Sequence, residues 1–235
     1  MRSRRAKVLH RVGGKPMVER VVGACLDAGL APIVVVVGHQ REKVEAAVRR
    51  AFPRAPLKFA WQREQKGTGH AVRVGLAHVG RGARRIVVTS GDTPLQRAAT
   101  LKVLAESQAT LAFVSARLGD ATGYGRVVRD RSRSGSPPAR IVEQKDATAR
   151  EKRICEANMG LYGIDATWLR NAIRGLRAKN AQGEFYLTDL VEMASRERKR
   201  VVAHRVRDAH EVLGVNTRDE LAAMSRRLES DSAHD

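Results

Sequence analysis

Residues 17–37 read MVERVVGACLDAGLAPIVVVV, and this stretch decides the fold class. Its first part, residues 17–28, repeats apolar side chains at helical spacing, with Pro16 placed where a helix starts (the apolar positions are Val18, Val21, Val22, Cys25 and Leu26). Its last part, Ile33–Val37, is an unbroken β-branched run, which is typical of a strand buried on both faces of a parallel sheet. A helix followed closely by such a strand predicts an α/β unit.

The same alternation continues along the chain. Apolar periodicity predicts further helices over residues 40–51, 68–79 and 101–108, and further strands over residues 57–61, 85–89 and 110–116. Strands that alternate with helices indicate a Rossmann-like, mostly parallel sheet with helices on both of its faces. The fold class predicted from the sequence is therefore α/β.

The pattern changes after Gly119. Short strands are predicted over residues 126–129 and 140–143, separated by the polar stretch RDRSRSGSPPAR, which we interpret as an exposed hairpin loop rather than an interdomain linker. Helices follow over residues 168–176, 187–196 and 218–228, with a strand over residues 200–206. We expect one domain over residues 1–230, with a substrate-binding β subregion, and a polar tail over residues 231–235.

Composition excludes several classes of protein. Hydrophobic residues make up 43% of the 235 positions, which is enough to bury a core, while aromatic residues make up only 4%. No run approaches the roughly 20 apolar residues of a membrane-spanning helix, and the basic start of the chain leads into no apolar segment of signal-peptide length. Two cysteines indicate neither a disulfide framework nor a metal knuckle. We expect a cytoplasmic protein that does not bind membranes.

The charge is strongly positive. Lys and Arg total 44 against 25 acidic residues, a formal net charge of +19. Such a balance suits nucleic-acid binding, but the arginines are spread along the chain and no aromatic residues alternate with them to stack on bases. We therefore prefer an Arg-rich surface that favours anionic small substrates over a nucleic-acid partner.

Polar clusters follow the predicted strands. In RIVVTSGDTPL, residues 85–95, the strand delivers Asp92 to the edge of the sheet where α/β proteins bind ligands. There the Asp92 carboxylate is either a ligand for a divalent cation or part of an Asx-type turn, and these readings are evenly balanced. In QREQKGTGHA, residues 62–71, Gln62 has the donor and acceptor to read a base, the glycines permit close backbone approach, and Thr68 has the hydroxyl to cap the following helix.

The second half of the chain adds oxygen-rich side chains. Glu143 and Asn158 have the groups to bind sugar hydroxyls. Asn216, in GVN just before the last helix, has the oxygen to complete a metal site with Asp92, and it is also a candidate N-cap of that helix.

Taken in order, eight motifs resemble the bacterial N-acetylglucosamine-1-phosphate uridylyltransferases: KVLHRVGGKPM, QKGTGHA, SGDTPL, TGYGR, IVEQKDAT, EANMG, NAQGEFYLTD and HEVLGVNTRDEL. The resemblance implies an enzyme that uses Mg2+ to transfer UMP from UTP to N-acetylglucosamine 1-phosphate, giving pyrophosphate and the cell-wall precursor UDP-N-acetylglucosamine. It implies that Lys7 contacts the phosphates and that Asp92 and Asn216 hold the metal. The remaining positions carried over by the resemblance are Gln62, Gly67 and Thr68 for the uracil side, Ser90 and Gly91 with Asp92 for the nucleotide, and Gly125, Glu143 and Asn158 for the amino sugar.

The resemblance also implies two departures from the family pattern. Such enzymes open with a strand and a glycine-rich loop of the form LAAGxGTRM, and many continue into an acetyltransferase β-helix; this sequence begins at the last Met of the loop and ends at Asp235. We expect the absent strand to lie beside Ile33–Val37 and the chain as written to be inactive. The alternatives are a nucleotidyltransferase for another sugar 1-phosphate, such as glucose 1-phosphate, and a non-catalytic sugar-phosphate-binding relic.

Overall fold

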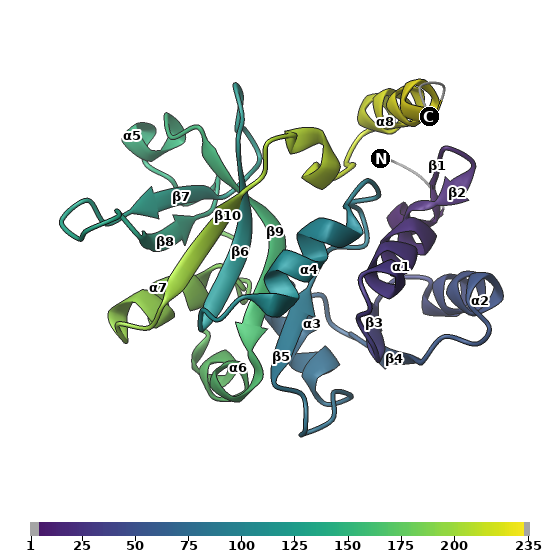
Figure 1. The fold of residues 1–235 in the computed structure, drawn as a ribbon, viewed down its shortest axis with the longest axis horizontal. Coiled ribbons are helices and arrows are strands. Elements are labelled where there is room, and N and C mark those ends of the chain that lie inside the picture. Colours follow the sequence, from purple (N-terminus) through teal and green to yellow (C-terminus); the bar gives the residue numbers. More distant parts are fainter. Residues whose placement is uncertain (1–4, 233–235) are drawn as a thin grey trace.

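The computed structural model describes residues 5–232, and its centre is a six-stranded sheet (Figure 1). The strands run in the order β10–β6–β9–β7–β8, with β5 also paired to β9. They comprise β5 (Arg85–Val88), β6 (Leu111–Arg117), β7 (Arg126–Arg129), β8 (Pro138–Val142), β9 (Glu156–Asp165) and β10 (Val201–Arg205). Apolar clusters on both faces of this sheet form the core.

The strand directions in this sheet are mixed. β10 pairs parallel with β6, whereas β9 runs antiparallel to β5, β6 and β7. The chain leaves β6, makes the β7–β8 hairpin, and then returns along β9, so β9 must run back in the opposite direction. The predicted α/β class is confirmed. The predicted parallel pairing is found between β6 and β10 but not between β9 and its neighbours. The sequence indicates only the first residues of β9, as the motif EANMG.

A second, two-stranded parallel sheet lies beside the first. It consists of β3 (Ile33–Val37) and β4 (Leu57–Trp61), and it packs with helices α1 (Met17–Asp27), α2 (Arg41–Ala51) and α3 (Thr68–Leu76). Val37 is buried, but Ile33–Val36 are only half-buried, as are all four residues of β5. The burial on both faces that was expected for Ile33–Val37 is therefore found only at Val37. Within residues 5–232, β3 and β5 each pair along one edge only, which leaves the other edge without a covering neighbour.

Helices cover both faces of the central sheet. On one face α6 (Ala166–Ala172) and α7 (Asp189–Arg196) bury Leu169 and Leu190 against Phe113; on the other, α4 (Ala98–Glu106) buries Leu101 and Leu104. Each such leucine stabilises the fold by roughly 1.5–3 kcal/mol through burial. The remaining elements are η1 (Lys7–Leu9), β1 (Arg11–Val12), β2 (Lys15–Pro16), α5 (Ala149–Lys152), η2 (Ile173–Gly175), η3 (Ala209–Val212) and α8 (Arg218–Ser232).

The first strands and the last helix of the described residues lie close together. Helix α8 packs on the β1–β2 hairpin, where Met224 and Val12 share an apolar cluster with Val215 (Figure 1). The helix includes residues 231 and 232, at which we had expected the polar tail to start, while residues 233–235 lie outside the described part of the chain. Segments remote in sequence thus meet at one edge of the molecule.

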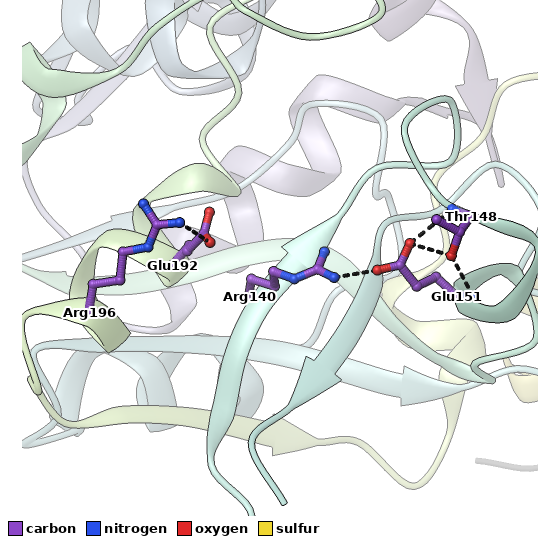
Figure 2. A network of polar contacts seen from close by, with 5 residues as sticks. All are labelled: Arg140, Thr148, Glu151, Glu192 and Arg196. Carbon is purple, nitrogen blue, oxygen red and sulfur yellow. Dashed lines mark hydrogen bonds and ion pairs between the residues drawn. The ribbon is translucent and has the colours of Figure 1, made fainter.

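Ionic contacts connect β8 to the start of α5. Figure 2 shows Glu151 between Thr148, which it caps reciprocally at the start of α5, and Arg140 on β8, with which it forms an ion pair. Hydrogen bonds from Thr148 and then from Arg140 lower the pKa of Glu151 to about 2. A separate pair, Arg196–Glu192 at 2.7 Å, lies along α7. The loop from Glu143 to Thr148 is thereby anchored at its far end. Between β7 and β8, the predicted exposed hairpin loop is confirmed.

Candidate active site

Lys7, Asp92 and Asn216 converge on one point. The Lys7 ammonium lies in η1, Asp92 follows β5, and Asn216 precedes α8. Lys7 Nζ donates a hydrogen bond to Asp92 Oδ2, with which it forms an ion pair, and another to Asn216 Oδ1 at 2.6 Å. The three side chains come from segments up to 209 positions apart, and they place two oxygen ligands around a single cationic group.

The backbone around Asp92 holds its carboxylate in position. Ser90 Oγ donates to Asp92 Oδ1 at 2.6 Å, and the Val215 N–H donates to the Asp92 carbonyl at 2.9 Å. Gly91 lets η1 approach, since a Cβ there would lie 3.1 Å from Val8 Cγ1. The Asp92 side chain is 23% exposed and that of Lys7 36% exposed, so the cluster opens to solvent and is accessible to a ligand.

The cap of α8 is Thr217 and not Asn216. Thr217 Oγ1 accepts from the Glu220 N–H at 3.1 Å, while Glu220 Oε2 accepts from the Thr217 N–H at 3.1 Å, which is a capping box. The N-cap prediction for Asn216 is therefore wrong: the helix begins one residue later than that role requires. Its side-chain oxygen is directed to Lys7 instead.

The Gln62–Gly67–Thr68 group forms a second cluster, at the start of α3. Gln62 Nε2 donates to the Gly67 carbonyl at 3.2 Å and lies 3.1 Å from His70 Nδ1. Gly67 has φ of +92° and packs against the Phe185 carbonyl, 2.8 Å from where a Cβ would lie, so a side chain does not fit there. Thr68 does not cap the helix as predicted; its hydroxyl accepts from the Leu187 N–H at 3.1 Å and so ties α3 to a distant loop.

Gly125, Glu143 and Asn158 form the third cluster. The Asn158 N–H donates to the Gly125 carbonyl at 2.8 Å, and a Cβ on Gly125 would lie 3.4 Å from Glu143 Oε2. The Asn158 side chain is buried and oriented by two bonds, to Tyr162 Oη at 2.7 Å and from the Gly160 N–H at 3.3 Å. These three residues are therefore adjacent, at the junction of β7, β8 and β9.

Residues 180–189 join the second and third clusters. The sequence indicates this motif as a whole but not which of its residues make the contacts. Thr188 Oγ1 donates to Glu143 Oε1 at 2.9 Å, next to the Leu187 N–H that binds Thr68. Asp146 Oδ2 accepts from Tyr186 Oη at 3.2 Å. The motif NAQGEFYLTD had been noticed as a whole, but nothing local in it reveals which side chains turn toward Glu143.

Carboxylates gather around this third cluster and repel one another. Burial raises the pKa of Glu143, with the hydrogen bond from Thr188 opposing it and the charges of Asp146 and Glu184 adding to it. Burial, and then the charges of Glu192, Glu143 and Asp146, raise the pKa of Asp189 to about 6. Such groups hold protons more tightly than usual and are suited to accepting hydrogen bonds from hydroxyl groups.

A link also runs between the first and third clusters. Tyr124, beside Gly125, receives a backbone hydrogen bond from Gly214, two residues before Asn216; burial raises its pKa and this bond opposes the rise. Contacts through Tyr124, Leu187 and Thr188 thus connect the three clusters. Within residues 5–232 no group of three His, Cys, Asp or Glu side chains could hold a metal ion by itself.

Comparison with known proteins identifies the family. The model of the MobA-like NTP transferase domain matches residues 1–153, which is more than half of the chain. The chain belongs to this family. The family resemblance stated from the sequence motifs is confirmed, and the MobA-like NTP transferase domain makes this protein a nucleotidyltransferase.

Similar proteins extend the match over nearly the whole chain. A "Bifunctional protein GlmU" from Anaeromyxobacter sp. (strain Fw109-5) is 50% identical over 230 residues, covering 97% of this chain and 46% of that protein. The protein of the same name from Corynebacterium aurimucosum is 42% identical over 236 residues, which cover 97% of this chain and 47% of that protein. The chain spans about half the length of the curated relatives it matches. No helix within residues 5–232 is long and apolar enough to span a membrane.

A solved structure confirms the fold of this NTP transferase domain. UDP-glucose pyrophosphorylase, crystallised with UDP-glucose, superposes with a TM-score of 0.72 over 96% of this chain and 90% of that one, at 16% identity. The nucleotide-diphospho-sugar transferase fold predicted from the sequence is thereby confirmed.

Proposed function

We propose that this protein transfers UMP from UTP to N-acetylglucosamine 1-phosphate, releasing pyrophosphate, and that its nucleotidyltransferase domain spans residues 1–230. The convergence of Lys7, Asp92 and Asn216 is the observation that supports it most. The similarity to proteins named GlmU supports the choice of substrates. A cytoplasmic location belongs to the proposal, since UTP is made in the cytoplasm and both cysteines are free thiols.

The reaction needs no activated protein nucleophile. A phosphate oxygen of the sugar phosphate, already anionic, attacks the α-phosphorus of UTP; the new O–Pα bond forms as the bond from Pα to the bridging oxygen breaks, and that oxygen leaves on pyrophosphate. Catalysis of such a transfer depends on in-line positioning and on neutralising charge on the phosphate oxygens. Lys7 supplies a positive charge beside Asp92 and Asn216 at the edge of the sheet, where it would stabilise the negative charge that builds up at the α-phosphate.

The residues present fit a magnesium ion. Asp92 and Asn216 direct one oxygen each at a common point where the Lys7 ammonium now binds both, which is the arrangement of hard oxygen ligands that Mg2+ takes when substrate phosphates complete its shell. When bound, Mg2+ would supply additional positive charge to the phosphates of both substrates. With the ion in place, we expect Lys7 to turn from Asp92 toward the phosphates.

The other two clusters would bind the two ends of the substrates. Gln62, Gly67 and Thr68 form a closely packed turn at the start of α3, and we assign them to the uracil side, with Ser90 and Gly91 alongside the nucleotide. Gly125, Glu143 and Asn158 would bind the amino sugar. The Gly125 position admits no side chain, because a Cβ would lie 2.8 Å from Ile141 Cγ2.

Substitution of Asp92 tests the proposal. Asp92→Ala should reduce pyrophosphate release from UTP and N-acetylglucosamine 1-phosphate by about 100-fold or more, as expected for loss of a group that organises charge in the transition state. Asp130→Ala, which removes a carboxylate in the β7–β8 turn, is the matched control and should retain wild-type rates. Wild-type rates in Asp92→Ala would contradict the site assignment. Faster turnover with glucose 1-phosphate than with the amino sugar would contradict the substrate assignment.

A further inference from the structure

A basic cavity lies where β6 and β10 end. Its volume is about 630 Å³, and its lining consists of Arg117, Arg205, Val206, Arg207 and Ala209. The three arginines are exposed. None of these residues belongs to the three clusters of the proposed active site.

The pairing of the strands places the arginines on one face. Arg205 lies opposite Ser115 in the parallel β10–β6 pair, and the Val206 N–H continues the ladder by donating to the Ser115 carbonyl at 3.0 Å. Because side chains alternate along a strand, Ser115 and Arg117 share a face with Arg205. Arg207 lies beyond the end of β10 and also lines the cavity.

The carboxylate on this face is already bound by another arginine. Glu156 of β9 lies opposite Arg117, and its two oxygens accept from Arg129 at 2.6 and 2.7 Å. Ser115 Oγ also donates to it, at 2.9 Å. Within residues 5–232 the side chains of Arg117, Arg205 and Arg207 form no hydrogen bond or ion pair, although, against the effect of burial, the charge of Arg205 helps Arg129 and Ser115 to lower the pKa of Glu156. One carboxylate against these arginines leaves the face with an excess of positive charge.

Such a cavity suits a ligand with several adjacent negative charges. Guanidinium groups bind phosphate oxygens through paired N–H donors, and several of them close together repel one another until an anion is bound. The cavity volume lies within the usual range for small-molecule sites, about 300–1,000 Å³. Apart from the arginines, only Val206 and Ala209 line it, so it offers no aromatic surface on which nucleic-acid bases could stack.

We propose that this cavity binds a compact polyphosphate anion, either inorganic or carried by a nucleotide, at a site separate from Lys7, Asp92 and Asn216. The site does not depend on the proposed catalytic function. Its recognition element is the set of three arginines that strands β6 and β10 bring to one face.

Calorimetric titration of the protein with inorganic tripolyphosphate tests this. We expect the double variant Arg205→Gln/Arg207→Gln to bind about tenfold more weakly or worse, since two charge-assisted contacts are lost. The control Arg131→Gln/Arg133→Gln removes the same charge from the exposed β7–β8 loop and should change affinity less than about twofold. The single variant Arg117→Gln should also weaken binding, and thermal melting should show that each variant remains folded.

Two further titrations test whether the anion binds at the catalytic cluster instead, and whether the ligand is inorganic polyphosphate or a nucleotide. Lys7→Ala should keep the tripolyphosphate affinity, and loss of binding in that variant would overturn the proposal by moving the site to the catalytic cluster. Parallel titrations with UTP and with tripolyphosphate show whether the base contributes to binding. Equal affinities for the two would identify the phosphates alone as the ligand. Tighter binding of UTP that still requires Arg205 and Arg207 would identify a nucleotide as the ligand. The proposal would be overturned if both double variants weakened tripolyphosphate binding equally. It would also be overturned if a short DNA duplex displaced tripolyphosphate and its binding required the same arginines.

Discussion

Among the side chains outside the apolar core, we expect the removal of Arg85 to lower the free energy of unfolding most. Its guanidinium donates three hydrogen bonds to backbone carbonyls: Nε to Leu104 at 2.7 Å, Nη1 to Ala109 at 2.8 Å and Nη2 to Gly163 at 2.6 Å. One side chain on β5 thereby joins the last turn of α4, the turn before β6, and β9. Burial lowers the pKa of Arg85, with the charge of Asp165 opposing it, which indicates how far the group is removed from water.

The magnitude follows from those three acceptors. A buried carbonyl left without a partner costs about 1–3 kcal/mol, and Arg85 is half-buried, so each loss should fall toward the lower end. We therefore expect Arg85→Ala to lower the free energy of unfolding by about 3–5 kcal/mol. Arg85→Lys, whose single ammonium cannot reach all three carbonyls in the same geometry, should lower it by about 2 kcal/mol.

Urea unfolding followed by circular dichroism measures both variants. Arg84→Ala is the matched control, because Arg84 is the exposed neighbour with no such contacts, and it should lie within about 0.5 kcal/mol of the wild type. If Arg85→Ala were no more destabilised than Arg84→Ala, the reasoning that this side chain clamps three elements would be refuted.

Two other variants probe the third cluster. Asn158→Ala should raise the Michaelis constant for N-acetylglucosamine 1-phosphate by roughly 5- to 150-fold and leave that for UTP nearly unchanged, because about 1–3 kcal/mol is lost per unmade hydrogen bond to the sugar. Equal effects in steady-state kinetics on both substrates would count against it. Asp189→Asn should flatten the pH dependence of stability. The pKa of Asp189 is raised from 3.8 to about 6, so its contribution to stability is present below pH 3.8 and is lost as the pH rises through about 6. At pH 7 the variant should thus be more stable, by roughly 1–2 kcal/mol after allowance for partial exposure, and urea midpoints at pH 5 and pH 7 that move in parallel with the wild type would contradict this.

Local periodicity predicted the helices and most strands closely. The helix expected at residues 17–28 is observed at Met17–Asp27, and the strands expected at residues 57–61 and 126–129 are found with the same bounds. Strand β9 was missed because its pattern is irregular. Gly160 has φ of +76°, and the pairing with β6 shifts register between Phe113 and Ser115, so the strand has neither strict alternation nor an unbroken apolar run.

The residues of the candidate site were predicted better than their contacts. Motif order pointed to Lys7, Asp92 and Asn216, and the structure brings these three together. Thr68 and Asn216 were each expected to cap a helix, and both expectations failed for the same reason. A cap is a local interaction, whereas the partners that these side chains have, Leu187 and Lys7, lie 119 and 209 positions away.

The sequence by itself determined the α/β class, the positions of the helices, and the family, because helical and strand periodicities and the order of motifs are properties of short segments. Only the tertiary structure decided that β9 runs antiparallel through the sheet, that Arg85 binds three carbonyls, and that Arg117, Arg205 and Arg207 meet in one cavity. These outcomes depend on which strands become neighbours. Neighbours are chosen by the packing of the whole core on both faces of the sheet, and no short stretch of sequence contains that information.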